Sequence, residues 1–137
     1  MSEKLISIKV ISPTRVFFEG EVKSFTVKTQ GEVGEFAVLV DHAPIAAAIG
    51  LGSLVLEMPD GEKKYSTLFG GYLVCQNNNA TVITENCEWP EEIDAERAEA
   101  AKKRAEERLK RSDIDFARAE SALRRATTRL ELYKLRK

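Results

Sequence analysis

Apolar and polar residues alternate along the first part of the chain and repeat at helical spacing along the last part. Near the start, Ile6, Ile8 and Val10 alternate with Ser7 and Lys9. Period two places successive side chains on opposite faces of a strand, so one face of such a strand is buried. The same reasoning predicts strands over 6–10, 16–20, 22–29, 36–40, 46–49, 53–58, 65–68, 72–76 and 80–84.

Turn residues separate these predicted strands. In Pro59-Asp60-Gly61, proline presets the first corner of a turn and glycine tolerates positive φ. Asn77-Asn78-Asn79 is the last hairpin connection, because asparagine tolerates the left-handed region. Many short strands with regular turn signals predict a β-sandwich or a small barrel.

The pattern changes near Trp89-Pro90. All 8 glycines and all 4 prolines lie at or before Pro90, and both residue types break helices. Asp94 is a good N-cap for a helix running to about Arg111. One face of this helix is predicted to carry Ala98, Ala101, Ala105 and Leu109.

A second helix is predicted after a break at Ser112-Asp113. Ser112 with Asp115 resembles a capping box, with Asp in place of the usual Glu or Gln. The helix then runs toward Lys137, and its apolar positions repeat with a 3-4 spacing: Phe116, Ala119, Leu123, Ala126, Leu130 and Tyr133.

The predicted fold is an all-β sandwich over residues 1–88 followed by an antiparallel two-helix hairpin over residues 89–137. A short turn between two amphipathic helices makes them antiparallel neighbours. The alanine face of the first helix lets the two backbones approach closely. Such a hairpin buries little apolar area and is marginal alone, so it needs the sandwich, a ligand or a partner to hold its shape. That marginality is the physical basis for a switch.

Composition limits the classes of function that the protein is expected to have. Hydrophobic residues make up 43%, enough for a core, and the net charge of −1 gives the whole molecule no strong attraction to nucleic acid. Cys75, Cys87 and His42 do not supply a zinc site, and the cysteines are expected to be free thiols in a reducing cytosol, with a disulfide as the alternative. No secretory signal opens the chain and no apolar run approaches the ~20 residues that cross a bilayer. The protein is expected to be soluble, or held at a membrane only by partners.

Several segments together resemble the epsilon subunits of F-type ATP synthases, along essentially the whole chain. In order, they are Gly31-Glu32-Val33-Gly34-Glu35-Phe36, Asp41-His42-Ala43-Pro44-Ile45, Gly50 to Val55, Gly70-Gly71-Tyr72-Leu73-Val74, Ala80-Thr81-Val82-Ile83 and Ile93-Asp94-Ala95-Glu96-Arg97-Ala98. Each motif alone is weak, whereas all of them in this order and at this spacing, across a strand-to-helix switch, are specific.

The resemblance implies a sandwich of about ten strands and a place in the central rotor of the enzyme. The sandwich is expected to bind the gamma subunit and to rest on the membrane ring of c subunits. The hairpin is expected either to fold on the sandwich or to extend along gamma into the alpha/beta catalytic head, where it blocks ATP hydrolysis. The chain would then be a non-catalytic, peripheral subunit on the cytoplasmic face of a bacterial cell membrane, needing no cofactor.

Two sets of contact residues follow from the resemblance. Glu32, at the tip of a glycine-flanked loop, is expected to face the c-ring, or else to be a solvated turn residue. His42 has no evident catalytic partners, so packing or a gamma interface is favoured over catalysis, and Ala43, Pro44 and Ile45 would extend that contact.

A regulatory ATP site is the second implication. Asp94 and Arg97 lie three apart on one helix face, where arginine suits phosphate and aspartate can accept from an adenine amino group or a ribose hydroxyl. The alternative is an N-cap beside a solvated residue. By resemblance the site would combine Glu88, Ile93, Asp94, Arg97, Ala98, Arg104, Arg125 and Arg129. No P-loop is present, so this site would regulate rather than hydrolyse.

The end of the chain is basic. From Arg118 onward only Glu120 and Glu131 oppose its cations, which are Arg118, Arg124, Arg125, Arg129, Lys134, Arg136 and Lys137. This face is either an ordinary solvated one or a salt-sensitive contact with an acidic segment of the beta subunits. It also raises the alternative of a nucleic-acid-binding protein, although aromatic residues are sparse near the arginines. A stand-alone enzyme is disfavoured because no nucleophile–base arrangement, metal set or cofactor fingerprint emerges.

Overall fold

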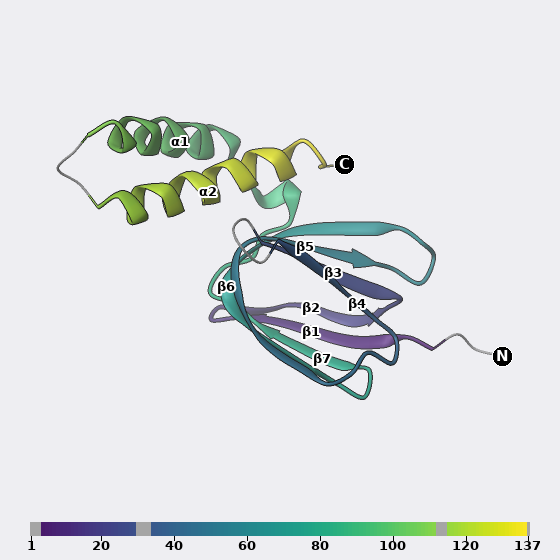
Figure 1. Ribbon diagram of the computed structural model, residues 1–137. Helices are drawn as coiled ribbons and strands as arrows, with labels where there is room; N and C mark the ends of the chain where they lie inside the picture. The colour runs from purple at the N-terminus through teal and green to yellow at the C-terminus, as the bar shows by residue number, and fades with distance from the viewer. Residues whose placement is uncertain (1–3, 30–33, 112–114, 137) are drawn as a thin grey trace.

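The computed structural model describes residues 4–29, 34–111 and 115–136. Its strands are β1 Ile6–Ser12, β2 Arg15–Val22, β3 Ser24–Thr29, β4 Glu35–Leu39, β5 Ile45–Glu57, β6 Lys63–Gln76 and β7 Asn79–Ile83. A short 3₁₀ helix, η1 Pro90–Glu92, precedes the helices α1 Ala95–Leu109 and α2 Phe116–Tyr133. The expected fold class, a β-sandwich followed by a helical hairpin, is confirmed (Figure 1).

The strands form one sheet in the order β2-β1-β7-β6-β5-β3-β4, which folds over into two layers. Strands β1 and β7 are parallel, and every other neighbouring pair is antiparallel. The long strands β5 and β6 pair along their lengths and pass from one layer to the other. In Figure 1 the layer with β1, β2 and β7 lies farther from the helices than the layer with β3 and β5.

Within the described residues the structure has seven strands, whereas the resemblance implied about ten. The predicted segments 46–49 and 53–58 both belong to β5, and 65–68 and 72–76 both belong to β6. Glycine allows this continuity: Gly70 and Gly71 have φ of 81° and 119°, and a Cβ at Gly71 would overlap the Ile83 carbonyl oxygen. The sequence pattern marks these glycines as breaks, whereas in the structure they bend β6 without interrupting it.

The core lies between the two layers and confirms the period-two pattern. Ile6, Ile8 and Val10 from β1 are buried against side chains of the other layer. The largest fully buried members from the remaining strands are Phe25, Leu54, Leu56, Leu68 and Leu73. Cys75 and Cys87 are buried free thiols, and burial raises the pKa of Cys87 to about 11. A thiol with so high a pKa is unreactive at neutral pH.

Both helices begin at aspartate caps. The Asp94 carboxylate accepts a hydrogen bond from the Arg97 backbone N–H at 3.1 Å, as the sequence predicts. Asp115 does the same for Arg118, also at 3.1 Å, so Asp115 is the N-cap of α2 rather than the distal member of a capping box. Ser112, the predicted cap, lies outside the described residues.

The hairpin packs through small side chains. The buried residues of α1 are Ala98 and Ala105, and they face a helix α2 that buries Ala119 and Ala126. The predicted face of α2 is wrong at Phe116, which is 61% exposed.

Helix α2 has a second buried face that the pattern did not reveal. Thr128 and Leu132, four residues apart, are buried where α2 packs against β5 and β6. One stripe of apolar residues along a helix predicts packing against one neighbour. Helix α2 packs against two, α1 and the sheet, so its second buried face was not predicted.

Candidate functional site

A cleft of about 550 Å³ opens between the N-terminal part of α1, the segment leading into it, and α2. The residues that line it are Asn86, Glu88, Glu92, Asp94, Arg97, Ala98, Ala101, Arg104 and Arg129. The structure therefore brings together most of the predicted nucleotide-site residues. The two exceptions are Ile93, whose side chain is buried, and Arg125, which is half-buried one turn before Arg129 and does not line the cleft.

The floor of the cleft is an ion pair between the sandwich side and α2. Arg129 Nε donates to Glu88 Oε1 at 2.7 Å, and each side chain is 25% exposed. The Arg129 guanidinium also lies 5.0 Å from the centroid of the Phe69 ring, a cation–π distance. A charge-assisted bond at this depth is stronger than a surface salt bridge, so this pair ties α2 to the sandwich.

Glu88 is itself held in place by a buried threonine. The Glu88 N–H donates to Thr67 Oγ1 at 2.8 Å, and the Thr67 N–H donates to the Glu88 carbonyl at 3.0 Å. Thr67 is fully buried in β6. The carboxylate that meets Arg129 is therefore mounted on the sheet rather than on a free loop.

The other cations of the cleft are open to a ligand. Arg97 and Arg104 are seven residues apart, two turns along one face of α1, and both are exposed. Within the described ranges neither side chain forms an ion pair. The cleft also receives the N-terminus of α1, where backbone N–H groups and the helix dipole favour negative charge. These features suit an anionic ligand.

Glu92 lies at the rim of the cleft, and its carboxylate is already engaged. Arg15 Nη2 donates to Glu92 Oε1 at 2.9 Å, and the Trp89 N–H donates to the same oxygen at 2.9 Å. The hydrogen bond from Arg15 is the main reason why the pKa of Glu92 is lowered from its usual value. Sequence reasoning missed Arg15, because it lies in β2, far from the helices in the sequence.

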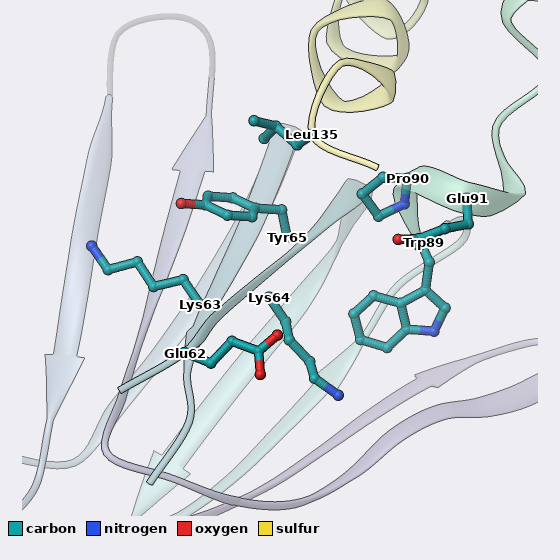
Figure 2. A pocket seen from close by; sticks show the side chains of 8 residues that line it. All are labelled: Glu62, Lys63, Lys64, Tyr65, Trp89, Pro90, Glu91 and Leu135. Carbon is teal, nitrogen blue, oxygen red and sulfur yellow. The ribbon is translucent and has the colours of Figure 1, made fainter. Parts of the chain in front are cut away.

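Two further cavities lie where the end of α2 meets the sandwich. One of about 310 Å³ is lined by Tyr65, Trp89, Pro90 and Leu135 with the charged residues around them (Figure 2). The second, of about 430 Å³, shares Tyr65 and Leu135 with the first. Both cavities are open to solvent, so the contact between α2 and the sandwich is closed over at Thr128 and Leu132 and open beside them.

The predicted interface residues lie apart from the cleft, between β4 and β5. His42, Ala43 and Pro44 are exposed. Ile45 begins β5 and packs against the core, and Glu32 lies outside the described residues.

This connection is held in shape by Asp41. Its N–H donates to Asn78 Oδ1 at 2.7 Å, and Asn78 Nδ2 donates back to Asp41 Oδ1 at 3.0 Å. The hydrogen bond from Asn78 is the main cause of a lowered pKa at Asp41. The reciprocal pair ties the residue before His42 to the turn between β6 and β7.

An exposed apolar row crosses the outer face of the layer that the helices do not cover. Strand register pairs Ala48 with Tyr72, Tyr72 with Ile83, Ile83 with Ile11 and Ile11 with Val16. Paired residues project from the same face of a sheet. Tyr72, Ile83 and Val16 are 65%, 55% and 51% exposed. Sequence reasoning missed this row because it depends on strand order, which period two does not give.

Comparison with known proteins identifies a class and then a family. A small β-sandwich with a C-terminal helical hairpin is the fold of a chain in the cryo-EM structure of the Euglena gracilis mitochondrial ATP synthase. That chain superposes with a TM-score of 0.80 at 21% identity, over 96% of this chain and 82% of its own length. At that identity the likeness shows the fold alone.

Family models and relatives go further. The model "ATP synthase, Delta/Epsilon chain, beta-sandwich domain" matches residues 5–90, and "ATP synthase, Delta/Epsilon chain, long alpha-helix domain" matches residues 91–134. The ATP synthase epsilon chain of Caldicellulosiruptor bescii is 42% identical over 103 residues, 74% of this chain and 72% of the relative. The sodium ion specific epsilon chain of Acetobacterium woodii is 37% identical over 102 residues, 74% of this chain and 75% of the relative.

The chain belongs to the ATP synthase delta/epsilon chain family. The resemblance seen in the sequence is thereby confirmed, and the chain is a component of an ATP synthase. The nucleic-acid-binding alternative gains no support from these matches. Across the described ranges no helix is long and apolar enough to span a membrane.

Proposed function

We propose that the chain is a non-catalytic subunit of the rotor, which links the catalytic head of the enzyme to the membrane ring of c subunits and restrains ATP hydrolysis through its helices. The observation that carries this proposal is the contrast between a sandwich with a large apolar core and a hairpin held on it by an ion pair and a small contact with solvent-open pockets beside it. A hairpin docked in this way is able to leave for another surface.

The exposed apolar row is the proposed docking face for gamma. Isolated apolar side chains on a surface need no explanation, but a contiguous row across five strands marks an interaction site. The segment His42-Ala43-Pro44 leads into Ile45, which pairs with Cys75 only three residues along β6 from Tyr72, so it lies at the same end of β5 and β6 and extends the contact. The loop with Glu32 is proposed to meet the c-ring. Through these partners the chain would be peripheral at the cytoplasmic face of a bacterial cell membrane.

The cleft is proposed to take ATP as a regulatory ligand. Arg97 and Arg104 would contact phosphate oxygens, and Asp94 would accept from the base or the ribose. A ligand that contacts both the helices and Glu88 at the sandwich would stabilise the docked hairpin, since binding to one state shifts the population toward it. No P-loop surrounds the cleft, so bound ATP would not be hydrolysed there.

Truncation tests the inhibitory role. A chain ending at Ile93 keeps every strand and η1, so we expect it to fold, to bind gamma and to assemble with the partner subunits. ATPase activity of the assembled complex should rise relative to the complex with the full chain. An unchanged rate would contradict an inhibitory hairpin.

Calorimetry tests the nucleotide site. Arg97→Ala should abolish or strongly weaken ATP binding to the isolated chain. Arg108→Ala is the matched control, because Arg108 lies on the same helix and does not line the cleft. Equal ATP affinity in the parent and in Arg97→Ala would remove Arg97 from the site.

A further inference from the structure

The segment that joins β7 to α1 is attached to the sandwich along its length. The Phe69 N–H donates to the Asn86 carbonyl and the Thr67 N–H donates to the Glu88 carbonyl, both at 3.0 Å. With the return bond from the Glu88 N–H to Thr67 Oγ1, these contacts pair the segment with β6. Main-chain hydrogen bonds of this kind make residues 86–88 part of the sheet structure rather than a tether.

Side chains extend this attachment as far as Glu92. Trp89 stacks on Phe17 of β2, with ring centroids 4.3 Å apart. The Arg15–Glu92 ion pair crosses from β2 to η1. The contacts with the sandwich therefore continue through Glu92 in η1.

The attachment stops before α1. Asp94 is exposed, and its carboxylate caps α1 rather than contacting the sandwich. Ile93 and Asp94 both have extended backbone, with φ, ψ of −75°, 128° and −85°, 98°, from which other allowed conformations are accessible without strain. Beyond this point the hairpin reaches the sandwich through α2, by the Arg129–Glu88 pair and by the packing of Thr128 and Leu132 against β5 and β6.

We propose that the hairpin leaves the sandwich by turning about the Ile93–Asp94 connection, and that residues 84–93 remain part of the sandwich in both states. This inference rests on the proposed function, in which the hairpin detaches. Glu88 then stays on the sandwich while Arg129 departs, so their ion pair is the latch that opens. Trp89 keeps its stack on Phe17 throughout. The boundary between the fixed and the moving part of the chain therefore lies after Pro90, near which the hydrophobic pattern changes from period two to helical spacing.

Two chemical crosslinks, called locks below, distinguish a pivot at Ile93–Asp94 from a pivot nearer β7. In the full chain, Arg15→Cys with Glu92→Cys would be joined by a short bis-maleimide, which fixes η1 to β2. Glu88→Cys with Arg129→Cys would be joined in the same way, which fixes α2 to the sandwich. The native Cys75 and Cys87 are buried and should react slowly, and single-cysteine variants are the controls. Each linked chain is assembled with the partner subunits, and ATPase activity is measured.

The pivot predicts opposite results for the two locks. The Arg15–Glu92 lock should leave ATPase at the inhibited rate of the unlinked chain, whereas the Glu88–Arg129 lock should raise it to the rate of the complex with the chain ending at Ile93. If both locks release inhibition, the segment before Ile93 has to move, and the pivot is wrong while the inhibitory function stands. If neither lock changes the rate, inhibition does not require a departing hairpin, and both the proposed function and the pivot are contradicted.

Discussion

The sandwich and the hairpin fill their interiors with different side chains. The sandwich buries Phe25, Leu54, Leu68 and other large residues completely, whereas α1 buries Ala98 and Ala105. Full burial of a Leu, Ile or Phe side chain contributes about 1.5–3 kcal/mol, and alanine offers a single methyl group. The sandwich is therefore stable through its own core, while the hairpin depends on what it docks against. The same chain thus combines a rigid base with a separable arm.

The largest expected effect comes from the sandwich core. Leu68→Ala should destabilise the chain by about 2–5 kcal/mol, since it removes a fully buried side chain and leaves a cavity. Leu130→Ala in α2 is the matched control, because Leu130 is only half-buried and should cost less than half as much. Urea denaturation followed by fluorescence of Trp89, the single tryptophan, measures both. Equal losses would mean that the two regions share one core.

The bend of β6 should also be sensitive. Gly71→Ala forces a Cβ onto the Ile83 carbonyl oxygen, so we expect a loss of about 1–3 kcal/mol or more. Gly61→Ala is the control: it also has positive φ, but its Cβ would meet nothing within 4 Å. Thermal unfolding of both variants checks the difference. If Gly71→Ala is as stable as Gly61→Ala, β6 does not need its bend at position 71 for the sheet to fold over into two layers.

The latch should affect the hairpin and spare the sandwich. Glu88→Gln replaces a charge-assisted bond to Arg129 and should weaken docking of α2 by about 1–2 kcal/mol. Glu120→Gln removes an ion pair to Arg124 within α2 and should change docking by at most about 0.5 kcal/mol. Limited proteolysis of the helices reports detachment. Similar cleavage rates in both variants would exclude the latch.

The smallest effect should depend on pH. Arg15→Ala removes a partly exposed ion pair and should cost about 0.2–1 kcal/mol at pH 7. The folded state lowers the pKa of Glu92, so the stabilisation is fully present above the carboxyl group's ordinary pKa and is lost as pH falls through the lowered value. Stability curves of parent and variant should therefore converge in acid. A difference that is constant down to the lowest pH would assign the loss to packing of Arg15 on Phe17 instead.

Much of the fold could be predicted from local pattern, because period and capping are local properties. The buried face of β1 and the caps at Asp94 and, in part, Asp115 follow directly from the sequence. The continuity of β5 and β6 could not be predicted, since a glycine that ends a strand and a glycine that bends one look alike. The buried face of α2 that includes Leu132 could not be predicted, because it packs against the sheet rather than against α1.

The cleft was predictable as a set of residues but not as an arrangement. The helical spacing of Arg97 and Arg104 is by itself enough to place them on one face of α1. The roles of Thr67 and Arg15 depend on strands that are distant in sequence, and no local signal points to them. The resemblance to a family supplied Glu88 and Arg129, and the structure shows that they form an ion pair.

Native-state hydrogen exchange on the isolated full chain tests the central claim most directly. Amides of α1, such as that of Ala105, should exchange through an opening whose free energy is clearly lower than that of the global unfolding reported by β6 amides such as that of Leu68. Glu88→Gln should lower the first free energy and leave the second unchanged. If the amides of α1 and β6 exchange with the same free energy, and shift together in the variant, the two regions unfold as one unit and the account of a separable arm is wrong.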